Sequence, residues 1–379
     1  MRVVFLRTNR IDPDPRVEKE AESLMKLPEF TLSAVVWDRG ERYGSRDRVL
    51  HYQNGEMAVH QFGIPASWGG GMKANFFPML KFEWKLFWWL MLHSSQYDTV
   101  HACDLLTGLP AWLPCRLHRK KMVYDIFDYY AATTSGPGMI LRIFDRLEKG
   151  VINAADAVII CSEKRSEQIA GTHPKKLTVL HNAPSGQQLN ANPDFHLQSV
   201  EKDVIRVAYA GNLVENRYLK QCIDALNGLE NVEFHIGGYG AMEDWIRKQA
   251  EENQRVFFYG KLDYDQVITL EKQCDLMIAL YDPEVPNHKY AAPNKFYEAM
   301  ALGKPLIMFH HTGMDENIKK YDVGEVCDPD TESLRRAFEK LIARKDEYRQ
   351  MAEREKKLFH EMFSWEMMEK RLHKLYKEL

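Results

Sequence analysis

Residues 292–308 read Ala-Pro-Asn-Lys-Phe-Tyr-Glu-Ala-Met-Ala-Leu-Gly-Lys-Pro-Leu-Ile-Met, which is a loop, a short helix and a strand in succession. Pro293 has a fixed φ that suits the first turn of a helix, so the free N–H groups from Asn294 onward would point at whatever lies in front. Such a helix start attracts phosphate, and Lys295 adds a positive charge there. Glu298 lies one turn on, where a carboxylate can bind the hydroxyls of a sugar. The stretch therefore predicts a nucleotide-sugar site.

The same residues also fit an ordinary amphipathic helix. Phe296, Met300 and Leu302 would then face the core, while the lysine and the glutamate would be solvated.

The length and composition are those of a globular protein with two domains. At 379 residues the chain is too long for one ordinary core and fits two domains of roughly 150–200 residues each. A hydrophobic content of 45% with 28% charged residues is typical of soluble proteins. The net charge of −3 gives no overall attraction to nucleic acid, so we expect no nucleic-acid partner and only local anion binding.

Neither the cysteines nor the first residues indicate a metal or a secreted protein. The six cysteines are far apart and show no Cys-x-x-Cys pair and no ligand spacing to histidine, so we expect reduced thiols, no metal and no cofactor. Arg7 and Arg10 follow a strand-like start at 2–6, which is not the pattern of a signal peptide. The most hydrophobic run, 87–92, is too short to span a bilayer. We therefore expect a cytoplasmic protein.

Short apolar runs alternate with helical patterns along the chain, as a parallel sheet requires. The expected strands of the first half are 2–6, 32–36, 99–102, 122–125, 157–161 and 177–180. Those of the second half are 205–209, 232–236, 256–259, 276–280 and 305–308. The pattern predicts two doubly wound, Rossmann-like α/β domains.

The domain limits follow from the same pattern. We expect an N-terminal domain at 1–186, a polar linker without a period at 187–203, a C-terminal domain at 204–358 and a closing helical segment at 359–379. Ligands of open α/β sheets bind at the carboxyl ends of the strands, so we expect the chemistry in a cleft between the two domains.

Three further strand ends of the second half carry residues suited to a nucleotide. Gly211 permits close backbone approach, and Arg217 and Lys220 near the next helix start could neutralise a diphosphate; solvated cations on a capping loop are the alternative. Gly238 lies in a Gly-rich turn after a strand, which also fits a turn without a ligand. Tyr259 ends another strand and could hold a flat base, although a buried aromatic strand fits as well.

Residues 75–93 interleave aromatic side chains with Lys81 and Lys85. Such a segment can rest in a lipid interface, which would give a peripheral membrane contact and a lipid-linked acceptor. The alternative is a core-facing crossover helix that leads to the strand at 99–102.

Taken together, the motifs resemble those of retaining glycosyltransferases of family 4, which have the GT-B fold. In the second half they are 211–213 with Arg217, 236–240, 258–260 and 293–305. In the first half they are 14–21, 100–104, 155–163 and 181–183, so the resemblance covers nearly the whole chain. It implies two facing Rossmann-like domains, with the segment 359–379 crossing back to the first domain.

The resemblance also implies a UDP- or GDP-sugar as donor, held mainly by the second domain. Glu298 would bind the ribose, the amides at Asn294 and Lys295 would contact the diphosphate, and Arg217 or Lys220 would stabilise the leaving phosphate. The predicted donor-binding residues are Gly211, Asn212, Lys220, Gly238, Tyr259, Asn294, Phe296 and Glu298. The departing phosphate oxygen would take the proton of the acceptor, so the protein supplies orientation and charge.

The first domain would bind the acceptor, a glycan or lipid-linked glycan, near Asp14, Arg16 and Asp104; for Arg16 a surface ion pair is the alternative. Three positions depart from the family pattern. Tyr290 stands where a Glu is frequent, Asn212 where an Arg is frequent, and Phe127 where many relatives have a sugar-binding His. Asp128 is then the best polar candidate beside the sugar, or else only a turn cap. We predict Arg217, Lys295 and Asp128 as the catalytic residues.

We therefore expect a retaining hexosyltransferase of polysaccharide or glycoconjugate biosynthesis. The alternatives are a nucleotide-sugar 2-epimerase of the same architecture and a non-catalytic glycan-binding protein. A nicotinamide-dependent oxidoreductase is disfavoured, because the loop at 7–13 lacks G-x-G-x-x-G.

Overall fold

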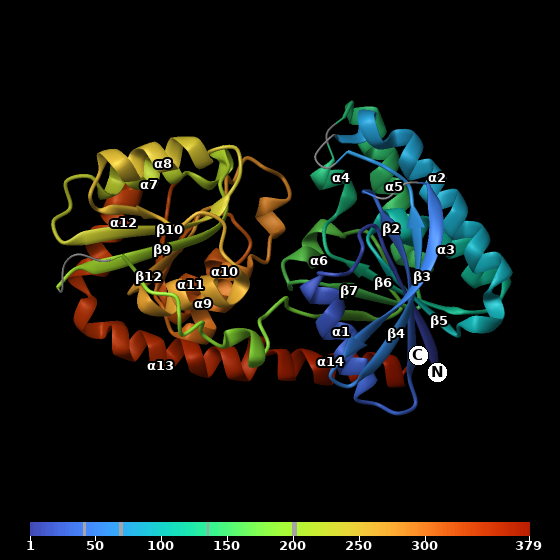
Figure 1. The fold of residues 1–379 in the computed structure, drawn as a ribbon. Helices are drawn as coiled ribbons and strands as arrows, with labels where there is room; N and C mark the ends of the chain where they lie inside the picture. The colour runs from blue at the N-terminus through green and yellow to red at the C-terminus, as the bar shows by residue number, and fades with distance from the viewer. Residues whose placement is uncertain (41–42, 68–70, 135, 199–202) are drawn as a thin grey trace. The chain divides into compact units, whose positions relative to one another are not determined.

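The computed structural model describes residues 1–40, 43–67, 71–134, 136–198 and 203–379, and the chain within them forms two compact units. The first unit consists of Met1–His181 with Met368–Leu379, and the second of Asn182–Met367 (Figure 1). Both units are α/β structures with a mostly parallel sheet, as the alternating pattern predicts.

The first unit is built on an eight-stranded sheet of order β3-β4-β2-β1-β5-β6-β7-β8. Neighbouring strands are parallel except for β3 and β4. The strands are β1 (Arg2–Arg7), β2 (Thr31–Asp38), β3 (Gly44–Tyr52), β4 (Gly55–Gly63), β5 (Thr99–Cys103), β6 (Lys121–Ile126), β7 (Ala157–Ile160) and β8 (Leu177–Val179).

Helices cover both faces of this sheet. Val4 and Leu6 of β1 belong to the core shared with α2, α3 and α5, whereas Phe5 stacks on His101, which meets Tyr376 of α14 on the opposite face. The helices are α1 (Pro15–Met25), α2 (Gly71–Leu92), α3 (Leu105–Leu117), α4 (Tyr130–Thr133), α5 (Gly138–Ala154), α6 (Arg165–Gln168) and α14 (Trp365–Lys377), with a 3-10 turn η1 (Ser94–Gln96). No helix in the described part of the chain is both long and apolar enough to cross a membrane.

The second unit is built on a six-stranded parallel sheet of order β11-β10-β9-β12-β13-β14. Its strands are β9 (Ile205–Asn212), β10 (Val232–Tyr239), β11 (Val256–Phe258), β12 (Leu276–Ala279), β13 (Leu306–Phe309) and β14 (Gly324–Cys327). Its α-helices are α7 (Leu219–Leu226), α8 (Glu243–Glu252), α9 (Tyr264–Gln273), α10 (Asn294–Leu302), α11 (Asp315–Tyr321), α12 (Thr331–Ala343) and α13 (Tyr348–Leu358). The short turns are η2 (Gln187–Leu189), η3 (Glu215–Arg217), η4 (His288–Tyr290), η5 (Lys345–Glu347) and the π-turn η6 (Phe359–Phe363).

The strands β3, β4 and β14 were not expected from the sequence. The antiparallel pair β3–β4 ends at Tyr52↔Gly55, and β3 is an edge strand whose side chains are mostly exposed. An edge strand that faces solvent can be polar along its length. Its sequence then lacks the apolar pattern from which a strand is predicted. The strand β14 is only four residues long and half-buried, which leaves too short a pattern to read.

The closing segment of the chain divides between the two units. Phe359 and Phe363 of η6 belong to a core of the second unit that also contains Phe296. From Met368 onward the chain belongs to the first unit, where the Tyr376 hydroxyl lies 2.7 Å from His101 Nδ1. The expected segment 359–379 thus packs on the first unit only through its second half, because η6 is held by aromatic contacts in the other unit.

Candidate functional site

Gly211 and Gly238 are paired near the carboxyl ends of β9 and β10 in the second unit. Gly238 has a φ of +146°, and a Cβ built on it would lie 1.9 Å from the carbonyl oxygen of Gly211. No larger residue fits that contact, so both strand ends approach through bare backbone. At these two paired positions the strand ends therefore present backbone without a side chain.

The helix α10 begins as its sequence predicts. Pro293 precedes the helix with φ −67° and ψ 134°, the helix runs over Asn294–Leu302, and Gly303 ends it with φ +70°. Asn294 is exposed, and its Oδ1 accepts a hydrogen bond of 3.0 Å from Asn182 Nδ2. Within the described residues no side-chain hydrogen bond caps the helix start, so the N–H groups of Asn294 and Lys295 can serve a ligand.

Lys295 brings its ammonium to the end of β9. A Cβ at Gly211 would lie only 2.6 Å from Lys295 Nζ, and the ring centroid of Tyr209 is 4.9 Å from that nitrogen. The Tyr209 hydroxyl donates to the carbonyl of Asn212 at 2.7 Å, which fixes the ring beneath the ammonium. Burial alone would lower the pKa of Lys295, but neighbouring phenols and carboxylates, including Tyr209 and Glu298, outweigh it and raise that pKa. The Lys295 side chain therefore stays protonated, and its ammonium lies between the Tyr209 ring and Gly211.

Glu298 lies one turn into α10 and is 4% exposed. Its Oε1 accepts a hydrogen bond of 2.9 Å from the Tyr264 hydroxyl. A second carboxyl group, Glu271 of α9, is fully buried nearby, and burial followed by repulsion from Glu298 raises its pKa well above the usual value. Two buried carboxyl groups therefore lie near one another, and the slightly more exposed one, Glu298, is oriented by a tyrosine.

Sequence reasoning identified Glu298 but missed Tyr264 and Glu271. The position of Glu271 could have indicated a functional residue, because it directly follows Ile268, Thr269 and Leu270, which are buried in α9 like Glu271 itself. A glutamate on the core face of an amphipathic helix is rarely left there without a role.

Arg217 is positioned by an aromatic ring and a histidine. Its guanidinium carbon lies 3.9 Å from the ring centroid of Tyr281, and its Nη1 lies 3.4 Å from Nε2 of His288. The other ring nitrogen of His288 lies 2.8 Å from the carbonyl oxygen of Asp282. Stacking and planar contacts of this kind suit arginine and orient a cation for an anionic group. Tyr281 and His288 were not singled out by sequence reasoning.

The other predicted donor residues face elsewhere. Phe296 is fully buried against Phe363, with ring centroids 5.4 Å apart, so its side chain is part of the core. The Tyr259 hydroxyl accepts from the amide of Gln198 at 3.0 Å and lies 2.9 Å from His235 Nδ1.

Lys220 forms an exposed ion pair of 2.9 Å with Glu215. Tyr290, at the position where the family resemblance expects a Glu, lies in η4 with Lys289 Nζ 5.4 Å from its ring centroid. Arg217 and Lys220, the two alternatives for contact with the leaving phosphate, are thus engaged differently.

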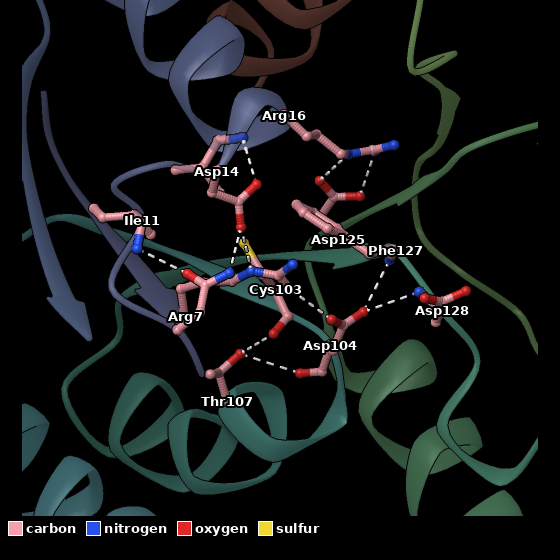
Figure 2. A network of polar contacts seen from close by, with 12 residues as sticks. Arg7, Ile11, Asp14, Arg16, Cys103, Asp104, Thr107, Asp125, Phe127 and Asp128 are labelled. Atoms are coloured by element: carbon pink, nitrogen blue, oxygen red, sulfur yellow. Dashed lines mark hydrogen bonds and ion pairs between the residues drawn. The ribbon is translucent and has the colours of Figure 1, made fainter. Parts of the chain in front are cut away.

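In the first unit, Arg7 links two of the predicted acceptor residues. Figure 2 shows its guanidinium between Asp14 and Asp104, with Nε 2.8 Å from an Asp14 oxygen and Nη1 2.6 Å from an Asp104 oxygen. Burial alone would lower the pKa of Arg7, but the two carboxylates raise it above the usual value. Asp104 also accepts from the amides of Phe127 and Asp128, at 2.9 and 3.1 Å. Asp14 and Asp104 are thus tied into one network at the strand ends.

Arg16 is a buried residue rather than a surface one. It is 5% exposed, contacts both oxygens of Asp125 at 2.7 and 3.3 Å, and lies 3.1 Å from Glu20 Oε1. Its guanidinium carbon is 4.5 Å from the ring centroid of Phe127. Burial and the neighbouring Asp125 raise the pKa of Glu20 well above its usual value, so Arg16 is paired mainly with Asp125. The ion pair given as the alternative to acceptor binding by Arg16 is therefore present, but it is internal.

Asp128 is the most exposed of the predicted residues of this unit, with a side chain 60% exposed against 20% for Asp104. One of its oxygens lies 3.9 Å from Nη2 of the buried Arg165. The exposed carboxylate of Asp128 thus lies at the surface beside an internal cation.

Among the described residues, Glu20, His101 and Asp125 have ligand atoms within 4.8 Å of one another, as a metal site would require. Arg16 already contacts both carboxyl groups, and the Tyr376 hydroxyl lies against the imidazole. A guanidinium at this place makes the cluster a structural ion-pair network that ties α1 and α14 to the sheet.

Two family models match the chain, one in each unit. Residues 25–183 match the glycosyl transferase 4-like domain, and residues 194–358 match glycosyl transferases group 1. An uncharacterized glycosyltransferase of Methanocaldococcus jannaschii is 26% identical over 196 residues, which are 49% of this chain and 48% of the relative. The chain thus aligns with about half the length of that curated relative.

Solved structures of the same fold cover the whole chain. Sucrose-phosphate synthase from Thermosynechococcus elongatus superposes with a TM-score of 0.76 at 15% identity, covering 100% of this chain and 99% of that one. Anabaena HepE, solved in complex with UDP, gives a TM-score of 0.70 at 15% identity, covering 100% of both chains. Together with the two matched domains, this fold assigns the chain to the GT-B glycosyltransferases, with a glycosyl transferase 4-like domain followed by a group 1 domain.

Proposed function

We propose that the chain transfers a hexose-type sugar from a nucleoside-diphosphate sugar to a glycan or lipid-linked glycan, with retention at the anomeric carbon. The observation that carries this proposal is the start of α10, where Lys295 Nζ lies against the backbone of Gly211 one turn before the buried carboxylate of Glu298. The Lys295 ammonium and the N–H groups at the helix start can bind a diphosphate, and the oriented carboxylate of Glu298 can accept hydrogen bonds from the two hydroxyls of a ribose.

The donor is bound mainly by the second unit in this proposal. The amides of Asn294 and Lys295 bind the diphosphate, and Glu298, oriented by Tyr264, accepts from the ribose hydroxyls. Arg217 lies on Tyr281 and is ready to meet the leaving phosphate. Because Lys220 is engaged with Glu215 at the surface, we assign the leaving-group role to Arg217 rather than to Lys220.

The reaction breaks the bond between the anomeric carbon and the β-phosphate oxygen and forms one to the acceptor oxygen on the same face. The acceptor's proton passes to the departing phosphate oxygen. Lys295 and Arg217 stabilise the negative charge that develops on this oxygen. Because two side-chain cations already balance that charge, we expect no metal requirement. The exposed carboxylate of Asp128 holds the transferred sugar.

The acceptor side belongs to the first unit. The network of Arg7, Asp14 and Asp104 fixes the backbone at 127–128, so these residues position the loop that carries Asp128. A lipid-linked acceptor would fit the segment 75–93 as a peripheral contact at the cytoplasmic face of a membrane. The relative HepE was solved with UDP, which supports a uridine nucleotide as the first donor to test.

A thermal-shift panel of UDP, GDP, ADP and their sugars tests donor binding. A ligand at 100 times its Kd adds about 2.7 kcal/mol of stability, so a matching nucleotide should raise Tm clearly. Glu298→Ala should abolish that shift, whereas Glu252→Ala, a change of an exposed glutamate in the same unit, should leave it intact. A shift that survives Glu298→Ala would remove the ribose assignment.

The pair Glu271 and Glu298 gives a second candidate, a nucleotide-sugar 2-epimerase, because such chemistry needs carboxyl groups around the sugar. Incubation with the donor alone separates the two. Epimerised sugar nucleotide formed without any acceptor would replace the transferase proposal, and neither epimerisation nor transfer would indicate a glycan-binding protein.

A further inference from the structure

The helices α2, α3 and α5 are consecutive crossover helices on one face of the first unit's sheet. They lead into β5, β6 and β7, α2 packs against α3, and α3 packs against α5 (Figure 1). Because parallel strands require crossovers of the same sense, the C-terminal ends of the three helices lie together at the edge where the strands begin. Their outer surfaces therefore form one continuous layer.

The outer face of α2 carries large apolar side chains, although no other described element of the first unit packs over them. Met79, Phe82, Leu86 and Leu90 are buried against the sheet, as a crossover helix requires. The opposite stripe consists of Phe77, Leu80, Trp84, Trp88 and Leu92, whose exposed fractions are 79, 43, 64, 42 and 73%. These positions recur every three or four residues, so they form a single line along the helix.

The apolar surface continues onto the two neighbouring helices. On α3 the exposed residues are Trp112, Leu113 and Leu117. On α5 they are Met139, Ile140, Ile143 and Leu147, of which Met139, the most exposed at 74%, Ile143 and Leu147 are spaced by four residues. The exposed Arg142 and Arg146 belong to the same helix. Contiguous apolar surface spread over three helices is rare on a monomer that contacts only water and marks an interaction surface.

A basic cavity adjoins this surface where α3 and α5 end. Its volume is about 390 Å³, and its lining includes five cationic residues, Arg116, Arg119, Lys120, Lys121 and Lys175, against one acid, Asp156. Asp156 is already engaged with Lys175 at 3.0 Å and with Lys121 at 3.9 Å. Within the described residues, Arg116 and Arg119 have no ion-pair partner. Trp112 belongs both to the cavity wall and to the apolar surface, so the two features are continuous.

We propose that this cavity receives the phosphate of an anionic phospholipid headgroup while the outer stripes of α2, α3 and α5 lie in the bilayer around it. The proposal extends the contact suggested above for 75–93, on which it rests, to α3, α5 and a headgroup site. Tryptophans at the border of an apolar surface and cations beside it match the interfacial region of a membrane with negative surface charge.

The charge pattern favours a lipid surface over a second copy of the chain. Two copies that met through this face would bring the same unpaired cations together, Arg116 and Arg119 among them, and like charges at an interface are repelled. An anionic bilayer supplies the opposite charge over the whole layer.

Vesicle flotation tests the proposal without any sugar donor, so its outcome is independent of whether transfer occurs. The full chain should bind vesicles of phosphatidylcholine mixed with phosphatidylglycerol and bind pure phosphatidylcholine at least several-fold more weakly. Salt of about 1 M, where the screening length falls to about 3 Å, should remove most of that difference.

Two sets of variants locate the contact. Arg116→Ser with Arg119→Ser should lower partitioning onto anionic vesicles roughly 25-fold, since each cation near the surface contributes about fivefold. Phe77→Ser with Trp84→Ser should weaken binding to both kinds of vesicle. The controls, Lys248→Ser with Arg349→Ser in the second unit and Val49→Ser on β3, change exposed residues outside this face and should leave binding intact.

Four results would overturn the proposal. The first is wild-type protein that does not float with anionic vesicles, and the second is flotation that none of the substitutions at Phe77, Trp84, Arg116 and Arg119 reduces. The third is self-association in sedimentation velocity that Phe77→Ser with Trp84→Ser abolishes, because the face would then be an interface between copies. Inorganic phosphate, compared with chloride at equal ionic strength, gives a fourth: if phosphate alone displaces the protein fully from vesicles, a free-phosphate site replaces the headgroup site.

Discussion

Lys295 Nζ lies so close to the α-carbon of Gly211 that a β-carbon at position 211 would sit 2.6 Å from it. The two residues belong to different elements, the end of β9 and the start of α10, and are 84 positions apart in the sequence. Gly211 therefore provides the space in which the cation is held, and its own φ of +152° favours glycine as well.

Gly211→Ala should accordingly displace the ammonium and weaken donor binding more than it weakens the fold. We expect the nucleotide-induced rise in Tm to be lost, with a decrease in the free energy of unfolding of roughly 1–3 kcal/mol. Gly150→Ala is the control, because its β-carbon would meet nothing within 4 Å. Equal nucleotide shifts in wild type and Gly211→Ala would show that Lys295 is not part of the donor site.

Substitution of Arg217 should lower kcat far more than substitution of Lys220. Arg217→Ala should lower kcat by about 100-fold or more, as loss of a group that stabilises transition-state charge does. Arg217→Lys should recover only part of this, since a lysine keeps the charge but not the planar contact with Tyr281. Lys220→Ala should change kcat little because Lys220 forms an exposed pair with Glu215. A larger effect at Lys220 than at Arg217 would reverse the assignment.

Glu148 should make stability depend on pH between about 4.5 and 8. Burial raises its pKa to about 8 from 4.5, while Tyr124 donates a hydrogen bond of 2.9 Å to it. In this window the unfolded chain releases the proton that the folded chain retains, so the group's contribution is full below pH 4.5 and is lost as the pH rises to 8. Glu148→Gln should remove this component, a few kcal/mol at most, and the difference is measured by urea unfolding at several pH values. If the free energy of unfolding depended on pH equally in the wild type and in Glu148→Gln, the raised pKa of Glu148 would be contradicted.

Tyr376→Phe should loosen the attachment of α14 to the first unit. The change removes the hydroxyl that lies 2.7 Å from Nδ1 of the fully buried His101, and an unsatisfied buried group costs about 1–3 kcal/mol. Hydrogen exchange should rise over 365–377 in particular. Tyr239→Phe, on a ring that is 54% exposed, serves as the control and should alter neither exchange nor stability.

Local signals explain which parts of the fold were predictable. The α10 stretch carries its own start at Pro293 and its own end at Gly303, so both limits could be read directly. The edge strand β3 could not, because a strand that faces solvent has no apolar alternation to detect.

The sequence by itself determined two α/β units, their alternating elements and the helix start at Asn294, since backbone propensity and hydrophobic periodicity act over neighbouring residues. Tertiary structure alone decided the partners of the charged side chains. Arg16 could have formed a surface pair but is buried against Asp125, Lys220 faces Glu215 while Arg217 lies on Tyr281, and Glu271 stands behind Glu298. The physical reason is that Coulomb and hydrogen-bond energies depend on distance and desolvation in space, neither of which is encoded by spacing along the chain.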